Sequence, residues 1–199
     1  MLYCKKYTES GENALFMKDK KISLAGDLGS GKSTVGKLLT QKFGLETVSI
    51  GKIHRQMASE YGMDVTEFNV YMESHPEIDN ELDARLKEYE LKNGNFLFDS
   101  RMAFHFVPSS FSVYMKVDAE IAGRRIFSEN RSNEKYESVE TAVQKLIERR
   151  ASESLRYSKF YGVDITDMSN YDFVIDTSSL SPQQVFDKIS AEFEKWLNK

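Results

Sequence analysis

The chain is poor in cysteine and proline, and it has no long hydrophobic run. Cys4 is the single cysteine, so no disulfide can form within the chain and an oxidised, exported scaffold is not expected. Three prolines and the lack of any low-complexity tract are typical of an ordinary globular protein. No apolar segment approaches the roughly 20 residues that span a bilayer, and none resembles a secretory signal. We therefore expect a cytoplasmic protein with no membrane partner.

The chain also lacks an excess of positive charge. It has 27 basic and 31 acidic residues and a net charge of −4, whereas a protein that coats nucleic acid normally carries a basic surplus. The basic residues are unevenly placed, because several arginines cluster between Arg124 and Arg156. We expect no nucleic-acid partner, but a local phosphate-binding pocket remains possible. We also expect a monomer.

Short apolar segments alternate with helical patterns from Lys21 onwards. Strands are expected at 22–25, 46–50, 95–98, 111–117 and 171–175, and helices at about 35–43, 76–92, from 119, 139–160 and from 181. A further helix containing Phe68 and Tyr71-Met72 is expected, with Asp64 or Thr66 as its cap. This alternation is typical of an α/β fold in which helices cover both faces of a parallel sheet. We predict a single domain at 20–199, with residues 1–19 as an N-terminal extension.

A phosphate-binding loop is indicated by Gly26-Asp27-Leu28-Gly29-Ser30-Gly31-Lys32-Ser33, which matches G-x-x-x-x-G-K-[ST] at every specified position. Glycines let successive backbone N–H groups turn toward phosphate oxygens at a helix N-terminus. Lys32 would supply a cation to the β- and γ-phosphates, and the Ser33 hydroxyl would bind Mg²⁺. A chance glycine-rich turn is the alternative, but the strand before the loop and the helix after it favour ATP binding. The predicted ATP-binding residues are Gly26, Asp27, Leu28, Gly29, Ser30, Gly31, Lys32, Ser33 and Thr34.

Three classes of phosphate-loop protein can be compared with the sequence. A GTPase should carry a guanine-reading N-K-x-D segment, and the sequence has none. A mechanochemical ATPase usually needs a longer chain and a partner subunit. A kinase of nucleotides or other small molecules fits the length, and it makes further demands that the sequence can be checked against.

Acidic and basic residues follow the ends of two predicted strands. Asp99 comes directly after the segment 95–98, where a second Mg²⁺ ligand is needed, and Arg101 stands two residues further on. Arg55 follows the segment 46–50. Because ligands of open α/β sheets bind at the carboxyl ends of strands, these arginines are candidates for holding an acceptor. Candidates for a cover over the transferring phosphoryl group are Arg124, Arg125 and Arg131. Any one of these arginines alone could equally be a solvated surface residue.

Arg149, Glu153 and Arg156 are spaced i, i+4, i+7 in the predicted helix 139–160, so they share one helical face. They could line a binding site. They could also form a surface ladder of ion pairs, which would contribute only a few tenths of a kcal/mol.

Several segments together resemble the cytidylate kinase family, especially its compact, archaeal-type branch. The resemblance runs from about Lys21 to Phe186. Besides the phosphate loop, it is carried by Ile50-Gly51-Lys52-Ile53-His54-Arg55, Glu67-Phe68, His75-Pro76-Glu77-Ile78-Asp79, Asp99-Ser100-Arg101, Arg149…Glu153…Arg156-Tyr157 and Tyr161-Gly162-Val163-Asp164-Ile165.

The resemblance implies the fold of a P-loop nucleoside monophosphate kinase, with a mobile nucleotide-binding flap at about 52–92 and a lid at about 125–138. It implies transfer of phosphate from ATP, with Mg²⁺, to CMP or dCMP in pyrimidine metabolism. Residues matching Arg55 and Arg101 hold the acceptor phosphate, and those matching Arg149, Glu153 and Arg156 approach the nucleoside. The implied catalytic residues are Lys32, Asp99 and Arg131, and the implied Mg²⁺ ligands are Ser33 and Asp99.

The chain departs from the family at Lys52, Ser100 and Phe104-His105. These positions are near the expected acceptor site, so the departures concern substrate choice more than reaction type. A kinase of a different nucleotide or of a polyol acid therefore stays open, with Asp99 as the base that a hydroxyl acceptor would need. A regulatory module that binds ATP without transferring phosphate is the other alternative.

Overall fold

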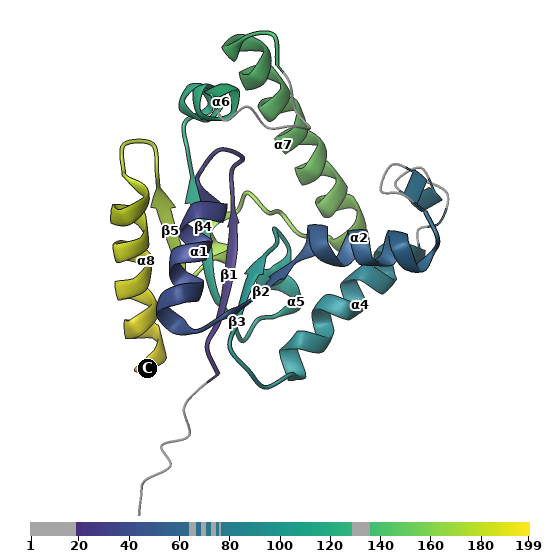
Figure 1. Ribbon diagram of the computed structural model, residues 1–199, viewed down its shortest axis with the longest axis horizontal. Helices are drawn as coiled ribbons and strands as arrows, with labels where there is room; N and C mark the ends of the chain where they lie inside the picture. The colour runs from purple at the N-terminus through teal and green to yellow at the C-terminus, as the bar shows by residue number, and fades with distance from the viewer. Residues whose placement is uncertain (1–18, 64–66, 69–70, 73–74, 76, 129–135) are drawn as a thin grey trace, which may run out of the picture.

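A five-stranded parallel sheet forms the centre of the molecule (Figure 1). The computed structural model describes residues 19–63, 67–68, 71–72, 75, 77–128 and 136–199, with the backbone alone for a few of them (Lys52, His54, Asp79, Leu82, Ser152 and Arg156). The strand order is β2-β3-β1-β4-β5, and every neighbouring pair is parallel. The strands are β1 (Lys21–Gly26), β2 (Glu46–Ser49), β3 (Phe96–Asp99), β4 (Phe111–Lys116) and β5 (Phe173–Asp176).

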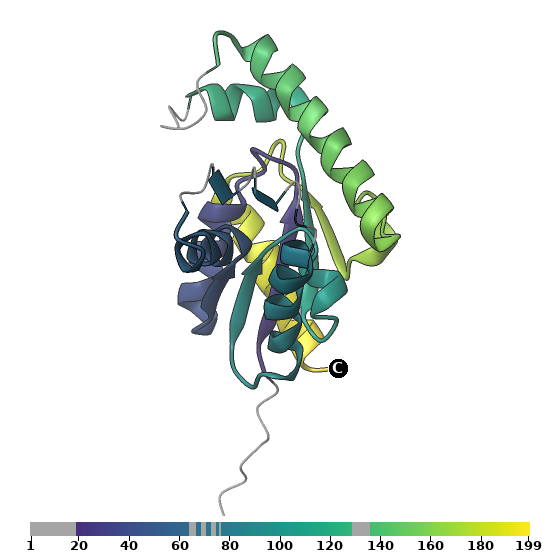
Figure 2. The same cartoon turned by 90° about the vertical axis from the view of Figure 1, so that its right-hand side faces the viewer.

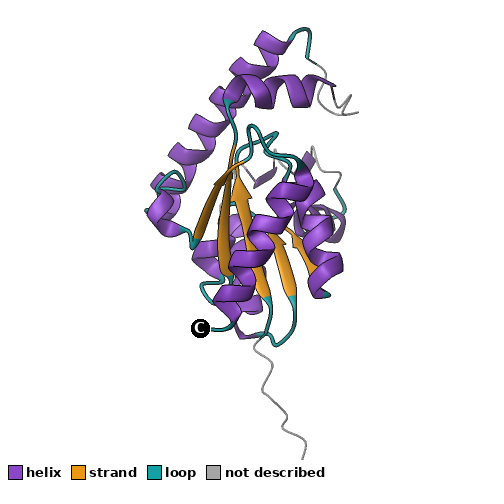
Figure 3. Cartoon of the chain, turned by 90° about the vertical axis from the view of Figure 1, so that its left-hand side faces the viewer, coloured by secondary structure: helices purple, strands orange, loops and turns teal. Residues whose placement is uncertain are grey.

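Helices cover both faces of this sheet, as Figure 3 shows. Helices α1 and α8 pack on one face, and α5 with α4 beside it packs on the other. The helices are α1 (Lys32–Phe43), α2 (Ile50–Glu60), α4 (Glu77–Leu91), α5 (Ala103–Phe106), α6 (Ala119–Ser128), α7 (Val139–Tyr161) and α8 (Pro182–Leu197). The α/β fold with a parallel sheet between helices, predicted from the sequence, is confirmed.

Helical periodicity explains how α1 and α8 build the larger core. Val35, Leu39 and Phe43 recur every four residues, so they share the face of α1 that is buried against the sheet. Helix α8 buries Val185, Ile189 and Phe193 with the same spacing. Its first turn is fixed by a capping box, in which the Ser181 hydroxyl accepts from the Gln184 N–H and the Gln184 side chain accepts from the Ser181 N–H.

Helices α6 and α7 pack together on the side of the molecule where the strands end (Figure 2). Gly123 of α6 lies so close to Val143 of α7 that a side chain at 123 would overlap with it. The C-terminal part of α7 returns alongside the core, where Tyr157 and Tyr161 pack against the cluster around Phe98.

Two helices of the structure were not expected from the sequence. We expected a loop after the strand at 46–50. Instead, helix α2 begins at Ile50, directly after the last residue of β2. Helix α5 has four residues, which is too short to produce a periodic pattern. The helix start expected at Asp64 or Thr66 lies outside the described residues, although Phe68 of that segment is fully buried.

Candidate active site at the phosphate loop

The phosphate loop joins the central strand β1 to the N-terminus of α1. Its glycines have backbone angles that other residues rarely adopt, with φ of 143° at Gly26, 78° at Gly29 and 88° at Gly31. At Gly26 the reason is also steric, because a Cβ would overlap with the backbone of Met115 in β4. The loop therefore winds tightly over the carboxyl ends of the strands and points the N-terminus of α1 at the space above them.

Lys32 is held against the loop itself. Its Nζ donates to the carbonyl oxygens of Gly26 and Asp27, each at 2.8 Å. Burial, assisted by the positive charge of Arg101, lowers the pKa of Lys32 from 10.5 to about 8, although Asp99 and Asp27 act in the opposite direction. The lysine thus lies where a phosphate-bearing ligand would restore the favourable environment of its charge.

A cavity of about 650 Å³ opens beside the loop. Its walls come from the loop and α1, from the β2–α2 junction, from the end of β3 and from α7. The lining residues are Leu24, Leu28, Gly29, Gly31, Lys32, Ser33, Thr34, Ser49, Ile50, Gly51, Asp99, Ser100, Arg101 and Tyr157. The volume is within the range of small-molecule sites, and the strand ends place it where ligands of open α/β sheets bind.

Arg101 connects this cavity to α7. Its Nε lies 2.8 Å from Oε2 of Glu153, and Nε of Arg149 donates to the other oxygen of the same carboxylate at 3.1 Å. Glu153 is only 16% exposed, and its partner Arg101 belongs to a different segment of the chain. The Arg149–Glu153 pair is therefore more than the isolated surface ladder that the spacing alone allowed.

The structure does not bring all predicted site residues together. Arg55 is exposed on α2 and does not line the described cavity. Arg156 lies on α7, but its side chain is outside the described part of the chain, and Arg131 is outside the described residues altogether. The predicted roles of these arginines stay predictions.

A second cavity, of about 150 Å³, lies on the other side of the loop, between α1 and α8. Thr34, Thr177, Leu180 and Pro182 contribute to its walls. Arg125 reaches it from α6, where its guanidinium donates to the carbonyl oxygens of Gly29 at 3.2 Å and Thr177 at 2.9 Å. Sequence reasoning named Arg125 only as one of several possible cover residues.

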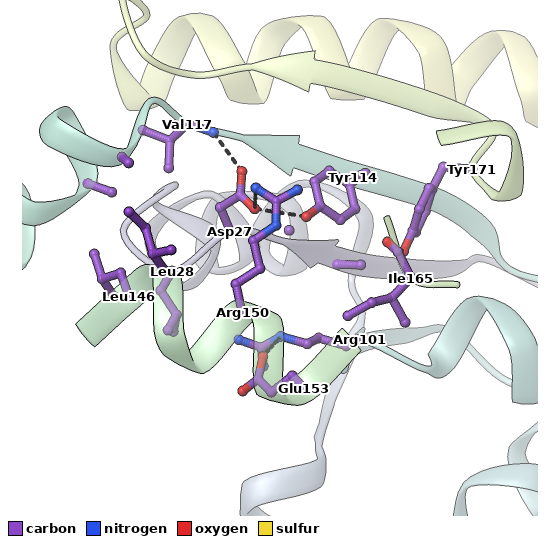
Figure 4. Close-up of a pocket in the computed structure, with 15 residues that line it drawn as sticks. Asp27, Leu28, Arg101, Tyr114, Val117, Leu146, Arg150, Glu153, Ile165 and Tyr171 are labelled. Carbon is purple, nitrogen blue, oxygen red and sulfur yellow. Dashed lines mark hydrogen bonds and ion pairs between the residues drawn. The ribbon is translucent and has the colours of Figure 1, made fainter. Parts of the chain in front are cut away.

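The side chain of Asp27 has a role that the loop motif does not specify. Figure 4 shows its carboxylate between Val117, Tyr114 and Arg150. No sequence signal identified Tyr114 or Arg150 as part of the site, because they come from β4 and α7 and meet Asp27 only in the folded chain.

A family model described as "Cytidylate kinase-like family" matches residues 21–179. The chain belongs to this family. The resemblance found in the sequence is confirmed, and membership of the cytidylate kinase-like family makes the chain a nucleoside monophosphate kinase, a phosphotransferase. Members of this family in general act on nucleotides and use ATP.

Two relatives illustrate the range of proteins that contain this unit. A cytidylate kinase of Pyrococcus horikoshii is 40% identical, with 89% of this chain and 90% of the relative covered. An S-adenosylmethionine-dependent nucleotide dehydratase of Lacinutrix mariniflava is 39% identical over 88% of this chain, but the chain spans only 36% of that protein. Among solved structures, the shikimate kinase of Bacteroides thetaiotaomicron aligns with a TM-score of 0.60 at 14% identity, over 88% of this chain and 98% of that one. This last likeness concerns the fold alone.

In the part of the chain that the structure describes, no helix is both long and apolar enough to cross a bilayer. Within the same residues, no group of three or more His, Cys, Asp and Glu side chains is arranged to hold a metal ion.

Proposed function

We propose that the chain transfers the γ-phosphoryl group of ATP to CMP or dCMP, giving ADP and the pyrimidine nucleoside diphosphate. The observation that carries the proposal is the arrangement of the 650 Å³ cavity. Lys32 and the loop line it for the donor. Arg101 lines it for the acceptor and pairs with Glu153, which also pairs with Arg149. We propose a monomeric cytoplasmic enzyme with a nucleotide-binding flap at about 52–92 and a lid at about 125–138, of which residues 129–135 lie outside the described residues.

The proposed reaction needs no general base. An oxygen of the acceptor's α-phosphate attacks the γ-phosphorus, the bond from that phosphorus to the β-bridging oxygen breaks, and ADP leaves with the electron pair. The attacking oxygen is already anionic, so no proton has to be removed. The chain's part is to orient the two nucleotides and to offset their negative charge with Lys32, Arg101 and further arginines.

The residues beside the loop suit Mg²⁺. Ser33 and Asp99 offer a hydroxyl and a carboxylate oxygen to the same cavity, and Mg²⁺ commonly takes one or two such ligands in addition to phosphate oxygens and waters. When bound, the ion would offset the charge of the β- and γ-phosphates. We also propose that the adenine of ATP occupies the 150 Å³ cavity beside Thr34 and Arg125.

The proposal is tested by supplying ATP and Mg²⁺ with CMP, dCMP, UMP, AMP and shikimate, and measuring ADP formation together with the phosphorylated product. We expect kcat/KM to be highest for CMP or dCMP. Preferential phosphorylation of shikimate would favour the polyol-acid alternative, in which Asp99 takes up the proton of a hydroxyl. Tight ATP binding without any product from any acceptor would favour the regulatory module.

The Lacinutrix relative favours a second, related candidate role. This chain matches about a third of a protein named as a nucleotide dehydratase, so a unit similar to this chain can belong to the same polypeptide as a dehydratase. We propose that the phosphorylated nucleotide made here is a precursor for such a dehydratase. The test is to incubate the chain, CMP, ATP and S-adenosylmethionine with a purified dehydratase of this kind from which the segment that matches this chain has been removed. A nucleotide product lighter by one water, formed only when the kinase is present, would support the role.

A further inference from the structure

The phosphate loop of this chain carries a negative charge, which is unfavourable in a loop that binds a triphosphate. Asp27 is the second residue of the loop, and its carboxylate is 11% exposed. Its charge acts on the lysine of the same loop, since it opposes the lowering of the Lys32 pKa. An anionic side chain in this loop would be expected to weaken the binding of ATP unless its charge is offset.

The carboxylate nevertheless has a structural use. Oδ1 accepts from the hydroxyl of Tyr114 at 2.8 Å, and Oδ2 accepts from the N–H of Val117 at 3.1 Å. Both partners belong to β4 or the residue that follows it, so Asp27 ties the loop to the neighbouring strand. An aspartate can accept both hydrogen bonds at once, which explains why it occupies this position in spite of its charge.

The charge that offsets Asp27 comes from a different element. Nη1 of Arg150, on α7, lies 3.1 Å from Oδ1 of Asp27. The two side chains meet across a small cavity of about 70 Å³ between the loop, the end of β4 and α7 (Figure 4). Arg150 is 48% exposed, so the pair contributes little to the stability of the fold. The Arg150 guanidinium can offset the charge of the Asp27 carboxylate even though the pair adds little to the free energy of unfolding.

We infer that Arg150 is a positioning residue that neutralises Asp27, so that the affinity of the phosphate loop for ATP depends on α7 lying against the loop. The same helix holds Glu153, which pairs with Arg101 at the acceptor side. Helix α7 thus touches the donor loop through one residue and the acceptor site through another, three positions along the chain. By linkage, ATP binding favours the position of α7 in which Glu153 reaches Arg101. The acceptor part of this inference rests on the proposed function, whereas the ATP part does not.

The test is a double-mutant cycle on ATP affinity, with the Kd of a fluorescent ATP analogue measured at low salt. R150Q leaves the Asp27 charge uncompensated, so we expect Kd to rise about tenfold, which corresponds to ~1.4 kcal/mol. D27N removes the charge from a residue of the loop itself, so its own Kd serves as the reference for the double variant. The double variant D27N/R150Q should have a Kd within about threefold of that of D27N, because the charge that needed an offset is gone.

Two further variants separate this effect from a general disturbance of α7. R150K keeps the charge and should stay near the wild-type Kd. K145Q removes an exposed charge from the same helix, where Lys145 pairs only locally with Glu148 at 2.9 Å, and it should leave Kd unchanged. Thermal unfolding of every variant shows whether the fold is intact. If Arg150 had a purely structural role, R150Q would lower the melting temperature and would raise Kd equally with and without the Asp27 charge.

The inference is overturned if R150Q binds the analogue like the wild type, or if R150Q raises Kd as much in the D27N background as in the wild type. Either result would show that Arg150 does not act through Asp27. Turnover with CMP is measured in parallel. Should the wild type phosphorylate no monophosphate, the proposed function fails, while the Kd series still decides the role of Arg150.

Discussion

At the scale of single residues, Lys32 is charged in surroundings that disfavour its charge. Because its pKa in the ligand-free protein is about 8, the ammonium form predominates only below that pH. ATP needs the ammonium form, so above pH 8 binding must be accompanied by uptake of a proton. We expect the Kd for ATP to rise as pH increases from 8 to 9.5, by up to about tenfold per pH unit. Titration calorimetry in buffers of different ionisation enthalpy measures both Kd and the proton uptake.

K32R is the control for this pH dependence, because a guanidinium keeps its proton throughout the range. Its Kd should stay flat between pH 7.5 and 9.5, even if the absolute affinity differs. Curves that run parallel for K32R and the wild type would show that another group causes the pH dependence.

Replacing Lys32 by methionine removes the cation and keeps much of the side-chain volume. One preorganised charge contact to a reacting group is commonly worth about 3–4 kcal/mol, so kcat should fall by at least about a hundredfold. The measurement is steady-state turnover of a variant whose circular dichroism and melting temperature match the wild type. Near-normal turnover in such a folded variant would contradict the assignment of the reaction to this loop.

Arg101 and Arg55 were predicted to share the acceptor phosphate, and the structure places them differently. Arg101 lines the cavity and pairs with Glu153, whereas Arg55 is exposed on α2. We expect R101M to raise the KM for CMP by about tenfold or more while the Kd for ATP changes little, since a charge-assisted hydrogen bond contributes about 1.5–3 kcal/mol. R55M should give a smaller rise, and initial rates over a range of CMP concentrations compare the two. A loss of ATP affinity in R101M would place the arginine on the donor side.

At the scale of elements, a buried lysine joins the start of β1 to the end of α4. Lys21 is 4% exposed, and its Nζ donates to the carbonyl oxygens of Tyr89 and Glu90, each at 2.9 Å. These carbonyls belong to the last turn of the helix, where a cation is favoured by the helix dipole.

K21M should leave both carbonyl oxygens without this donor. We expect it to lower the free energy of unfolding by about 1–3 kcal/mol, the usual range for a buried polar group that loses its partner. Chemical denaturation measures the change, and the Kd for ATP should stay as in the wild type because the phosphate loop is at the other end of β1. K20M, at an incompletely buried neighbour, serves as the control and should change stability by much less.

The elements also show what the sequence could predict. Helical patterns in the sequence predicted α1, α7 and α8, and the glycine pattern located the loop between β1 and α1. Helix α5 was missed because four residues carry no period. In the site, the loop residues were predictable because the motif is contiguous. The contacts of Asp27 with Tyr114 and Arg150 were not, since they depend on how β4 and α7 meet in three dimensions.

At the scale of the whole molecule, ligand binding should be visible as stability. Bound ATP contacts the native loop and not the unfolded chain, so at a concentration of one hundred times Kd it should add about 2.7 kcal/mol to the free energy of unfolding. Thermal scanning with increasing ATP tests this, and the melting temperature should keep rising beyond saturation of the site. K32M should show a much smaller rise at the same ATP concentrations. An equal rise in both proteins would indicate that ATP binds elsewhere.

The parallel strands give the sheet two unlike edges. All five strands end at the edge that carries the phosphate loop, whereas the described chain enters β1 at Lys21 and leaves α8 at Leu197 near the opposite edge (Figure 1). Lys21 and Leu197 therefore lie on the side of the molecule away from the cavity beside the phosphate loop. A bead, an affinity handle or a second enzyme tethered through Lys199 would leave the path of nucleotides open. Protein immobilised in this way should turn over at the rate measured free in solution.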